Sequence, residues 1–123
     1  MAKSKGRRNR ASLRPRLRVM VGDEIALGPG RVDLLELIEE TGSLRAAARR
    51  MGVSYMRAWN LIKYTNKCFR EPVIEVARGG KTGGGAKLTK TGQRASVLYR
   101  KMEKRCCDSN RQSWADMRRL LLR

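Results

Sequence analysis

The sequence predicts a mainly α-helical fold with small β elements (α+β), and three observations support this prediction. The 123 residues suit one domain. Hydrophobic residues make up 41% and aromatic residues 5% of the chain, enough for a modest core. Apolar residues recur at helical spacing in several segments and form short strand-like runs in others, with glycines between them. The order expected is a hairpin, three helices, a glycine-rich hairpin and a long C-terminal helix.

The N-terminal third combines a polar arm, a hairpin and an amphipathic helix. Residues 1–16 contain too few apolar side chains to offset the cost of ordering, so we expect a disordered basic arm before a domain over residues 17–112. Short apolar runs on either side of residues 22–24 predict a hairpin. Pro29 can open a helix that runs from about Gly30 to Thr41, and Gly42 can end it. Its acidic side chains lie mostly opposite its apolar ones, which predicts a solvated acidic face.

Two short helices separated by a glycine are predicted over residues 43–67. Ser43 can cap a helix from Leu44 to Met51, and Ser54 can cap another from Tyr55 to about Lys67. Ala48 lies where the helices would cross, Gly52 supplies the positive φ of the turn, and three apolar residues would face the core: Val53, Ala58 and Leu61. This spacing is typical of a helix-turn-helix, and an ordinary helical hairpin is the alternative.

A glycine-rich hairpin and a long helix complete the predicted fold. Residues 73–77 and 86–88 are predicted strands, and five of the eight residues in the loop at 78–85 are glycine. Thr89 can cap a helix that ends near Asn110, with an apolar stripe of Ala95, Leu98, Met102 and Cys106. A shorter helix over residues 113–123 would continue an apolar seam of Trp114, Met117 and Leu121. The whole pattern fits a winged helix-turn-helix.

The charge of the chain points to a polyanionic partner. The formal net charge is +18, from 29 Lys and Arg against 11 Asp and Glu. Residues 1–22 contain eight basic residues and no acid, whereas residues 23–42 contain six acids and one arginine. Nucleic acid is the expected partner, because each neutralised phosphate releases a condensed counterion. The basic arm either solubilises the chain or contacts phosphate or the minor groove.

If the helix-turn-helix is correct, its second helix enters the major groove of double-stranded DNA. Arg57 could then bind guanine and Asn60 adenine, while Arg49 and Arg50 could contact phosphate. Trp59 is expected to pack against the protein. The residues expected to face the groove are Ser54, Tyr55, Met56, Arg57, Asn60 and Lys63. In the loop, Arg78, Lys81 and Thr82 would contact the DNA backbone as a wing, and an ordinary hairpin turn is the alternative.

Other function classes receive little support from the sequence. Histidine is absent, and no nucleophile-base pair or catalytic carboxylate cluster is evident, so neither an enzyme nor a cofactor is expected. The glycine loop lacks the ending of a nucleotide-phosphate loop and leads into a strand. Cys68, Cys106 and Cys107 lack metal-ligand spacing, and an odd cysteine count favours a reducing compartment. Without a secretory signal or an apolar membrane span, the expected location is the cytoplasm.

Three stretches together closely resemble the N-terminal DNA-binding domain of the molybdate-dependent ModE regulators, a LysR-type winged helix-turn-helix. These stretches are Thr41–Ala48, Met51–Trp59 and Gly79–Thr89. The pattern Ser-Tyr-x-x-Ala-Trp begins at Ser54, and Gly-Gly-Lys-x-Gly-Gly-Gly-Ala begins at Gly79. The two patterns are specific in combination, and the resemblance covers about Leu17 to Cys106.

The resemblance implies a homodimer that binds a palindromic operator as a transcriptional regulator. It implies that the helix from Gln93 to Asn110 contributes to the dimer interface, that Ser54–Lys63 reads the groove, and that Arg78–Gly85 contacts the backbone. The C-terminal oxyanion-binding domains of the family are missing from this chain, so molybdate binding by the chain itself is not expected. A non-specific nucleic-acid-binding structural protein and a protein-binding adaptor remain the alternatives.

Overall fold

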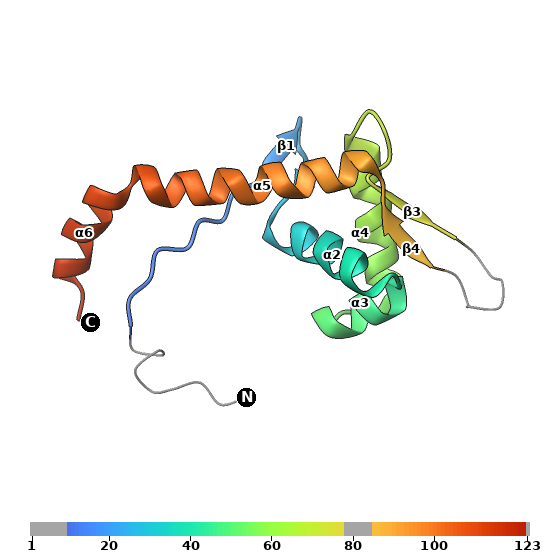
Figure 1. Ribbon diagram of the computed structural model, residues 1–123, viewed down its shortest axis with the longest axis horizontal. Coiled ribbons are helices and arrows are strands. Elements are labelled where there is room, and N and C mark those ends of the chain that lie inside the picture. Colours follow the sequence, from blue (N-terminus) through green and yellow to red (C-terminus); the bar gives the residue numbers. More distant parts are fainter. Residues whose placement is uncertain (1–9, 78–84, 123) are drawn as a thin grey trace. The chain divides into compact units, whose positions relative to one another are not determined.

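The computed structural model describes residues 10–77 and 85–122 (Figure 1). The chain divides into two compact units. One unit is Arg16–Arg100 and carries the winged helix-turn-helix. The other, as far as it is described, consists of residues 10–15 and 101–122. The fold is the α+β arrangement that the sequence predicts, with an N-terminal hairpin and a long C-terminal helix.

The predicted N-terminal hairpin is present. Strand β1 (Val19–Val21) pairs antiparallel with β2 (Glu24–Leu27). Gly22 adopts a φ of +59° in the two-residue turn between them, a conformation that glycine adopts without steric cost. The register shifts between Val19 and Met20. At its far end β2 is buried, which anchors the hairpin to the core.

Local capping explains why the first two helices begin and end where they do. Helix α2 (Pro29–Thr41) begins with proline and ends at Gly42, which has a φ of +68° and donates from its backbone N–H to the Ile38 carbonyl at 2.7 Å. Helix α3 (Leu44–Met51) begins at Ser43, whose Oγ accepts from the Ala46 N–H at 3.0 Å. The predicted bounds of both helices are therefore correct within one residue.

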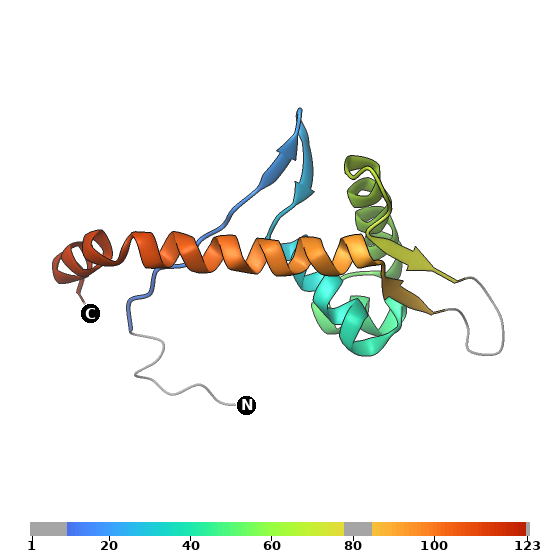
Figure 2. The same cartoon turned by 45° about the horizontal axis from the view of Figure 1, so that its top comes forward.

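Helices α2, α3 and α4 (Tyr55–Cys68) pack around one core. Figure 2 shows the three helices grouped beside the first part of helix α5, with β3 and β4 extending from the same group. Small residues of α3 and α4 lie in this core with large apolar residues of α2, and Tyr99 of α5 closes it. Its most buried members include Val32, Leu35, Ile38, Ala47, Ala58, Val73 and Tyr99.

Hydrogen bonds of the Asn66 side chain hold the second hairpin in place. Strand β3 (Ile74–Val76) pairs antiparallel with β4 (Ala86–Leu88). The Asn66 Oδ1 accepts from the Val73 N–H at 2.8 Å and from the Ile74 N–H at 3.3 Å, while its Nδ2 donates to the Ile74 carbonyl at 3.2 Å. The strand is shorter than the predicted 73–77, because Val73 bonds to this side chain before the strand begins.

Helix α5 (Lys90–Ser109) buries a different stripe from the one expected. Gly92, Ser96 and Tyr99 are its buried residues, and the Tyr99 hydroxyl donates to the Leu17 carbonyl at 2.8 Å. The predicted stripe is largely outside the core, since Leu98 and Met102 are exposed. Position 92 must be small because it meets Val73, and the Tyr99 hydroxyl needs the Leu17 carbonyl as its acceptor. Both requirements come from residues far away in the sequence, which helical spacing alone does not indicate.

Helix α6 (Arg111–Leu120) follows a break at Asn110 and has no buried residue. Of the predicted seam, Trp114 is half-buried, whereas Met117 and Leu121 are exposed. Within the described residues, no helix is both long enough and apolar enough to cross a membrane.

The contact between α5 and Val73 predicts that Gly92→Ala is strongly destabilising. A Cβ atom at Gly92 would meet the Val73 carbonyl, and backbone in a well-packed site can yield only at a cost of about 1–3 kcal/mol. Gly30→Ala is the matched control, because a Cβ at that helical glycine meets open space. Urea unfolding of both variants measures the difference, and equal stabilities would contradict the packing described here.

Candidate nucleic-acid interface

The turn between α3 and α4 has the geometry of a helix-turn-helix. Gly52 adopts a φ of +77°, and its N–H donates to the Arg49 carbonyl at 3.1 Å. The next N–H, from Val53, donates to the Ala48 carbonyl at 3.0 Å. These bonds end α3 and reverse the chain within three residues. The Ser54 Oγ then accepts from the Arg57 N–H at 3.0 Å and begins α4.

One face of α4 is buried and the other is exposed. Ala58, Ile62 and Thr65 are at most 3% exposed and fix the helix on the core. Leu61, predicted to face the core, packs against it but is only half-buried, and Ile62 takes the deeper position. The opposite face carries Met56, which is 65% exposed, together with the exposed Arg57, Asn60, Lys63 and Tyr64. No acidic residue occurs in α4, so this face presents only neutral and cationic groups.

Tyr55 is less exposed than the sequence analysis expected. It is half-buried, and its ring meets the ring of Trp59 edge-on at a centroid distance of 6.3 Å. The guanidinium of Arg45 lies 4.5 Å from the Tyr55 ring centroid, a cation-π contact. Tyr55 therefore joins α3 to α4 and supports the exposed face from beneath. Trp59 packs against the core as predicted.

The two arginines at the end of α3 are exposed, as a phosphate contact requires. Arg49 and Arg50 lie in its last turn, where a cation also interacts favourably with the helix dipole. Arg50 forms an ion pair with Glu40 at 3.2 Å, with both side chains more than half exposed. Such a pair contributes little stability and exchanges readily with a stronger anion.

Strands β3 and β4 flank the residues that are predicted to form the wing. Arg78, Lys81 and Thr82, predicted to contact the DNA backbone, lie outside the described residues. At the base of the loop, the Ala77 N–H donates to the Gly85 carbonyl at 2.8 Å, and the Ala86 N–H donates to the Gly42 carbonyl at 3.1 Å. The last bond joins the hairpin to the start of the helix-turn-helix.

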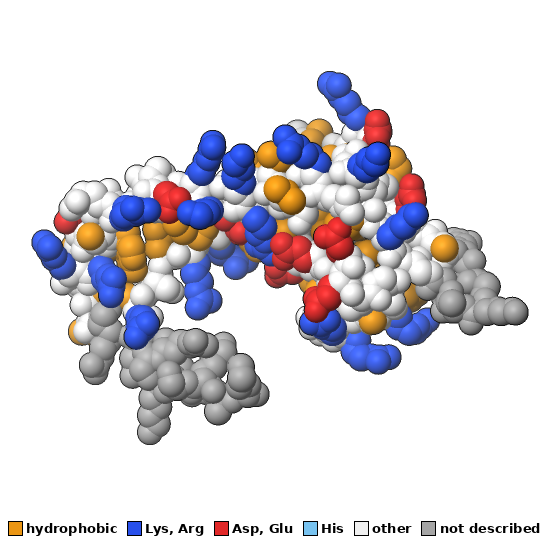
Figure 3. Space-filling view, viewed as in Figure 1, with side chains coloured by type: hydrophobic (Ala, Val, Ile, Leu, Met, Phe, Trp, Pro, Cys, Tyr) orange, Lys and Arg blue, Asp and Glu red, His pale blue; other side chains and the backbone are white. Residues whose placement is uncertain are grey.

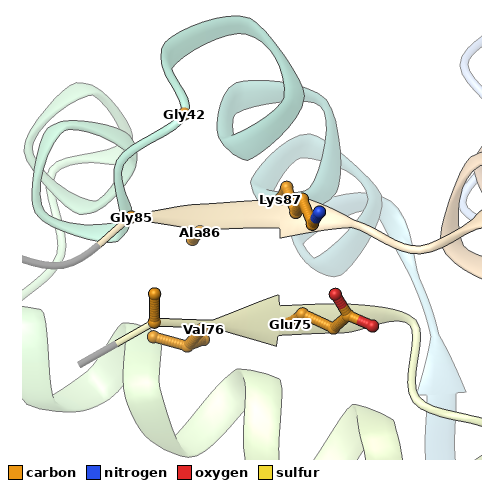
Figure 4. Close-up of a pocket in the computed structure, with 7 residues that line it drawn as sticks. Gly42, Glu75, Val76, Gly85, Ala86 and Lys87 are labelled. Atoms are coloured by element: carbon orange, nitrogen blue, oxygen red, sulfur yellow. The ribbon is translucent and has the colours of Figure 1, made fainter.

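A cavity of about 440 Å³ lies beside this junction (Figure 4). Glu75 and Lys87, which are cross-strand neighbours, lie at one side of it and Gly42 with Gly85 at the other. A Cβ atom at Gly85 would lie 3.4 Å from the Gly42 carbonyl oxygen, at the limit of ordinary van der Waals contact. Opposite charges facing each other across the strands leave this cavity without a strong preference for an anion or a cation.

The acidic face of α2 is not simply solvated, contrary to expectation. Arg100 of α5 donates from Nε and Nη2 to the two carboxylate oxygens of Glu36 at 2.8 and 2.7 Å, and from Nη2 to Asp33 at 2.8 Å. Gln93 of α5 donates to Glu39 at 3.0 Å. Figure 3 shows the carboxylates gathered where α2 meets α5. The hydrogen bonds and charge of Arg100 lower the pKa of Glu36, against the opposing effect of burial.

Three of the known proteins that resemble this chain match about two thirds of its length or less. No family model matches the chain. The transcriptional regulator ModE of Yersinia pestis is 45% identical over 71 residues, which are 58% of this chain and 27% of that protein. The DNA-binding transcriptional dual regulator ModE of Escherichia coli K12 is 44% identical over 71 residues, again 58% and 27% of the two chains. The molybdenum-pterin-binding protein MopB of Rhodobacter capsulatus is 44% identical over 77 residues, 63% and 28% of the two.

The chain is a homologue of the ModE-type regulators over one domain. It spans between 25% and 34% of the length of these relatives. The proteins named as regulators contain the shared part together with additional sequence. The ModE-like domain thus provides the frame on which the exposed residues of α3 and α4 are placed.

The Ser54 cap predicts a specific loss of stability. Ser54→Ala leaves the Arg57 N–H without its partner and should lower the free energy of unfolding by about 1 kcal/mol. Ser54→Asp retains an acceptor at the same position and should restore most of the loss. Urea denaturation followed by circular dichroism measures both, and a neutral Ser54→Ala variant would show that the cap is dispensable.

The Arg100–Glu36 pair predicts a pH dependence of stability. Because the folded-state pKa of Glu36 is lowered, its contribution is present above the usual value of 4.5 and is lost as the pH falls through the lower folded pKa. The pair is partly exposed, so the effect should stay below about 1 kcal/mol. Arg100→Met should flatten this part of the stability curve between pH 5 and about 3, whereas the exposed control Arg94→Met should leave its slope unchanged.

Proposed function

We propose that this chain is a sequence-specific DNA-binding transcriptional regulator that occupies a palindromic operator as a homodimer. The observation that carries the proposal is the two-faced α4: its buried residues fix it on the core, and its acid-free outer face is exposed. A helix of this kind, at the second position of a helix-turn-helix, fits the major groove of B-form DNA. The names of the ModE relatives describe regulators, which supports the same function here.

The chemistry of the exposed side chains assigns their roles. In the proposed complex, Arg57 donates two hydrogen bonds to O6 and N7 of guanine, and Asn60 bonds N6 and N7 of adenine. Both lie on the exposed face of α4, one helical turn apart. Met56 can contact a thymine methyl group, and Lys63 with Arg49 can reach phosphates. Ser54 begins the helix at the groove, and Tyr55 supports it from below.

Helix α5 supplies the proposed dimer contact. It exposes Val97, Leu98 and Met102, and apolar side chains of this size on one helix are commonly covered in an oligomer. A two-fold dimer would place two α4 helices about 34 Å apart, one turn of DNA, which accounts for a palindromic site. In this proposal the protein acts in the cytoplasm, where bacterial DNA is accessible.

The strongest competing function is non-specific nucleic-acid binding, which the net charge of +18 favours. Affinities for a selected duplex and for random duplexes, each measured at two salt concentrations, separate the two functions. A specific regulator binds the selected duplex at least about a thousandfold more tightly. Equal affinities with a steep salt dependence on every duplex would support the structural protein and contradict the proposal.

We expect the protein to prefer its operator sequence less strongly when the proposed contact of Arg57 with guanine is removed. Arg57→Ala should weaken binding to the selected operator by about 1–3 kcal/mol and relax the preference for guanine at one position of each half-site. Fluorescence anisotropy with operators varied at single positions measures both effects. Arg118→Ala, which removes the same charge from an exposed position of α6, is the control, and an identical loss in the two variants would reject the assigned role of Arg57.

We expect a loss of affinity that is the same for every duplex when the proposed wing contact of Lys81 is removed. Lys81→Ala should weaken binding to all duplexes by the same factor and reduce the slope of log affinity against log salt by about one. The base preferences should stay those of the wild-type chain. A changed preference in this variant would assign a base contact, rather than a backbone contact, to the wing.

A further inference from the structure

A second pocket lies beside the start of α2, and two residues of α4 are among those that line it. It has a volume of about 250 Å³ and is formed by the stretch before β1, by β2, by the first turn of α2 and by the α3–α4 region. Its floor is apolar, with Ile25, Pro29, Met51, Val53 and Leu61. No carboxylate is among the residues that line it. Four arginines surround it: Arg16, Arg18, Arg31 and Arg57.

The charge around this pocket is not compensated within the described part of the chain. The ion pairs found there use other cations, namely Arg50, Arg100, Lys104 and Arg111. Arg31 donates one hydrogen bond to the Ile25 carbonyl and keeps further guanidinium donors. Like charges gathered around a concave apolar surface repel one another until an anion binds.

The backbone at the pocket also favours an anion. Gly28 precedes α2 in an extended conformation with no side-chain cap, and the first turn of the helix contains no acid. Pro29 has no N–H, so the first-turn donors that point out of the helix are those of Gly30 and Arg31. A Cβ atom at Gly30 would meet nothing within 4 Å, so no described side chain or backbone crowds this position of the first turn.

We propose that this pocket binds one phosphoryl group, held by Arg16, Arg18 and Arg31 and by the N–H groups of the first turn of α2. Guanidinium groups and a helix N-terminus are complementary to a tetrahedral oxyanion. Because Arg57 belongs both to the pocket and to the exposed face of α4, the source favoured is a backbone phosphate beside the bases that α4 reads. In that form the inference rests on the proposed DNA-binding function. Free inorganic phosphate has the same chemistry and is the other source.

Gly30→Glu is the decisive variant, because it should weaken anion binding without lowering the stability of the fold. A carboxylate in the first turn interacts favourably with the helix dipole, and glutamate has a higher helix propensity than glycine, so the melting temperature should not fall. The same carboxylate should occupy the anion site and repel a phosphate. Gly30→Gln is the neutral control, and Ser113→Glu adds the same charge on α6.

Two titrations of the ¹⁵N-labelled full chain distinguish the sources. One uses a duplex selected for tight binding, and the other uses inorganic phosphate alone; in each, the amide signals of Gly30 and Arg31 are followed. If the source is DNA, Gly30→Glu should bind the duplex about fivefold more weakly than the wild-type chain and lower the salt slope by about one. Gly30→Gln and Ser113→Glu should stay within about twofold of wild type.

The outcomes decide separately on the pocket and on the proposed function. A saturable shift of the Gly30 amide with inorganic phosphate, abolished by Gly30→Glu while duplex affinity is unchanged, supports the pocket with free phosphate as its source. If the wild-type chain binds no duplex, the proposed function fails, and the inorganic phosphate titration alone decides on the pocket. The inference is overturned if the Gly30 and Arg31 amides respond to neither ligand, or if Gly30→Glu and Gly30→Gln behave alike in both titrations.

Discussion

The close approach of α3 and α4 is the constraint on which the rest of the structure depends. Ala48 and Ala58 are at most 2% exposed, and larger side chains there would push the helices apart. Gly52 allows the chain to reverse between them because it adopts a φ of +77° at no steric cost. The burial of one face of α4 by this packing leaves the opposite face outward. The proposed reading of DNA follows from that orientation, since the same side chains on a rotated helix would be hidden.

The distribution of charge is a consequence of tertiary structure as much as of composition. Carboxylates of α2 are bonded by Arg100 and Gln93 of α5, which holds much of the acidic charge at the α2–α5 contact. The exposed face of α4 carries no acid. A polyanion that approaches α4 therefore meets cationic and neutral groups, while the acids serve to position α5 on the domain. This separation makes a protein with a large net charge directional.

Local features of the fold could be predicted from the sequence, and non-local ones could not. Ser43, Gly52 and Ser54 determine helix ends through bonds to backbone only three or four residues away, so their roles were evident from spacing. The hydrogen bond between Asn66 and Val73 and the ion pairs of Arg100 with α2 join residues that only the folded chain brings together. The half-burial of Tyr55 was not evident for the same reason, because a position one residue after a cap does not reveal the neighbouring Arg45 and Trp59.

The central claim is that the outer face of α4 lies in the major groove, and chemical footprinting tests it most directly. Dimethyl sulfate methylates guanine N7 in the major groove and adenine N3 in the minor groove, so it reports which groove the protein covers. On a duplex selected from a random pool, the account predicts protection of guanine N7 in two patches one helical turn apart. Protection of adenine N3 alone, or no protection of guanine N7 on any duplex that the chain binds, would contradict it.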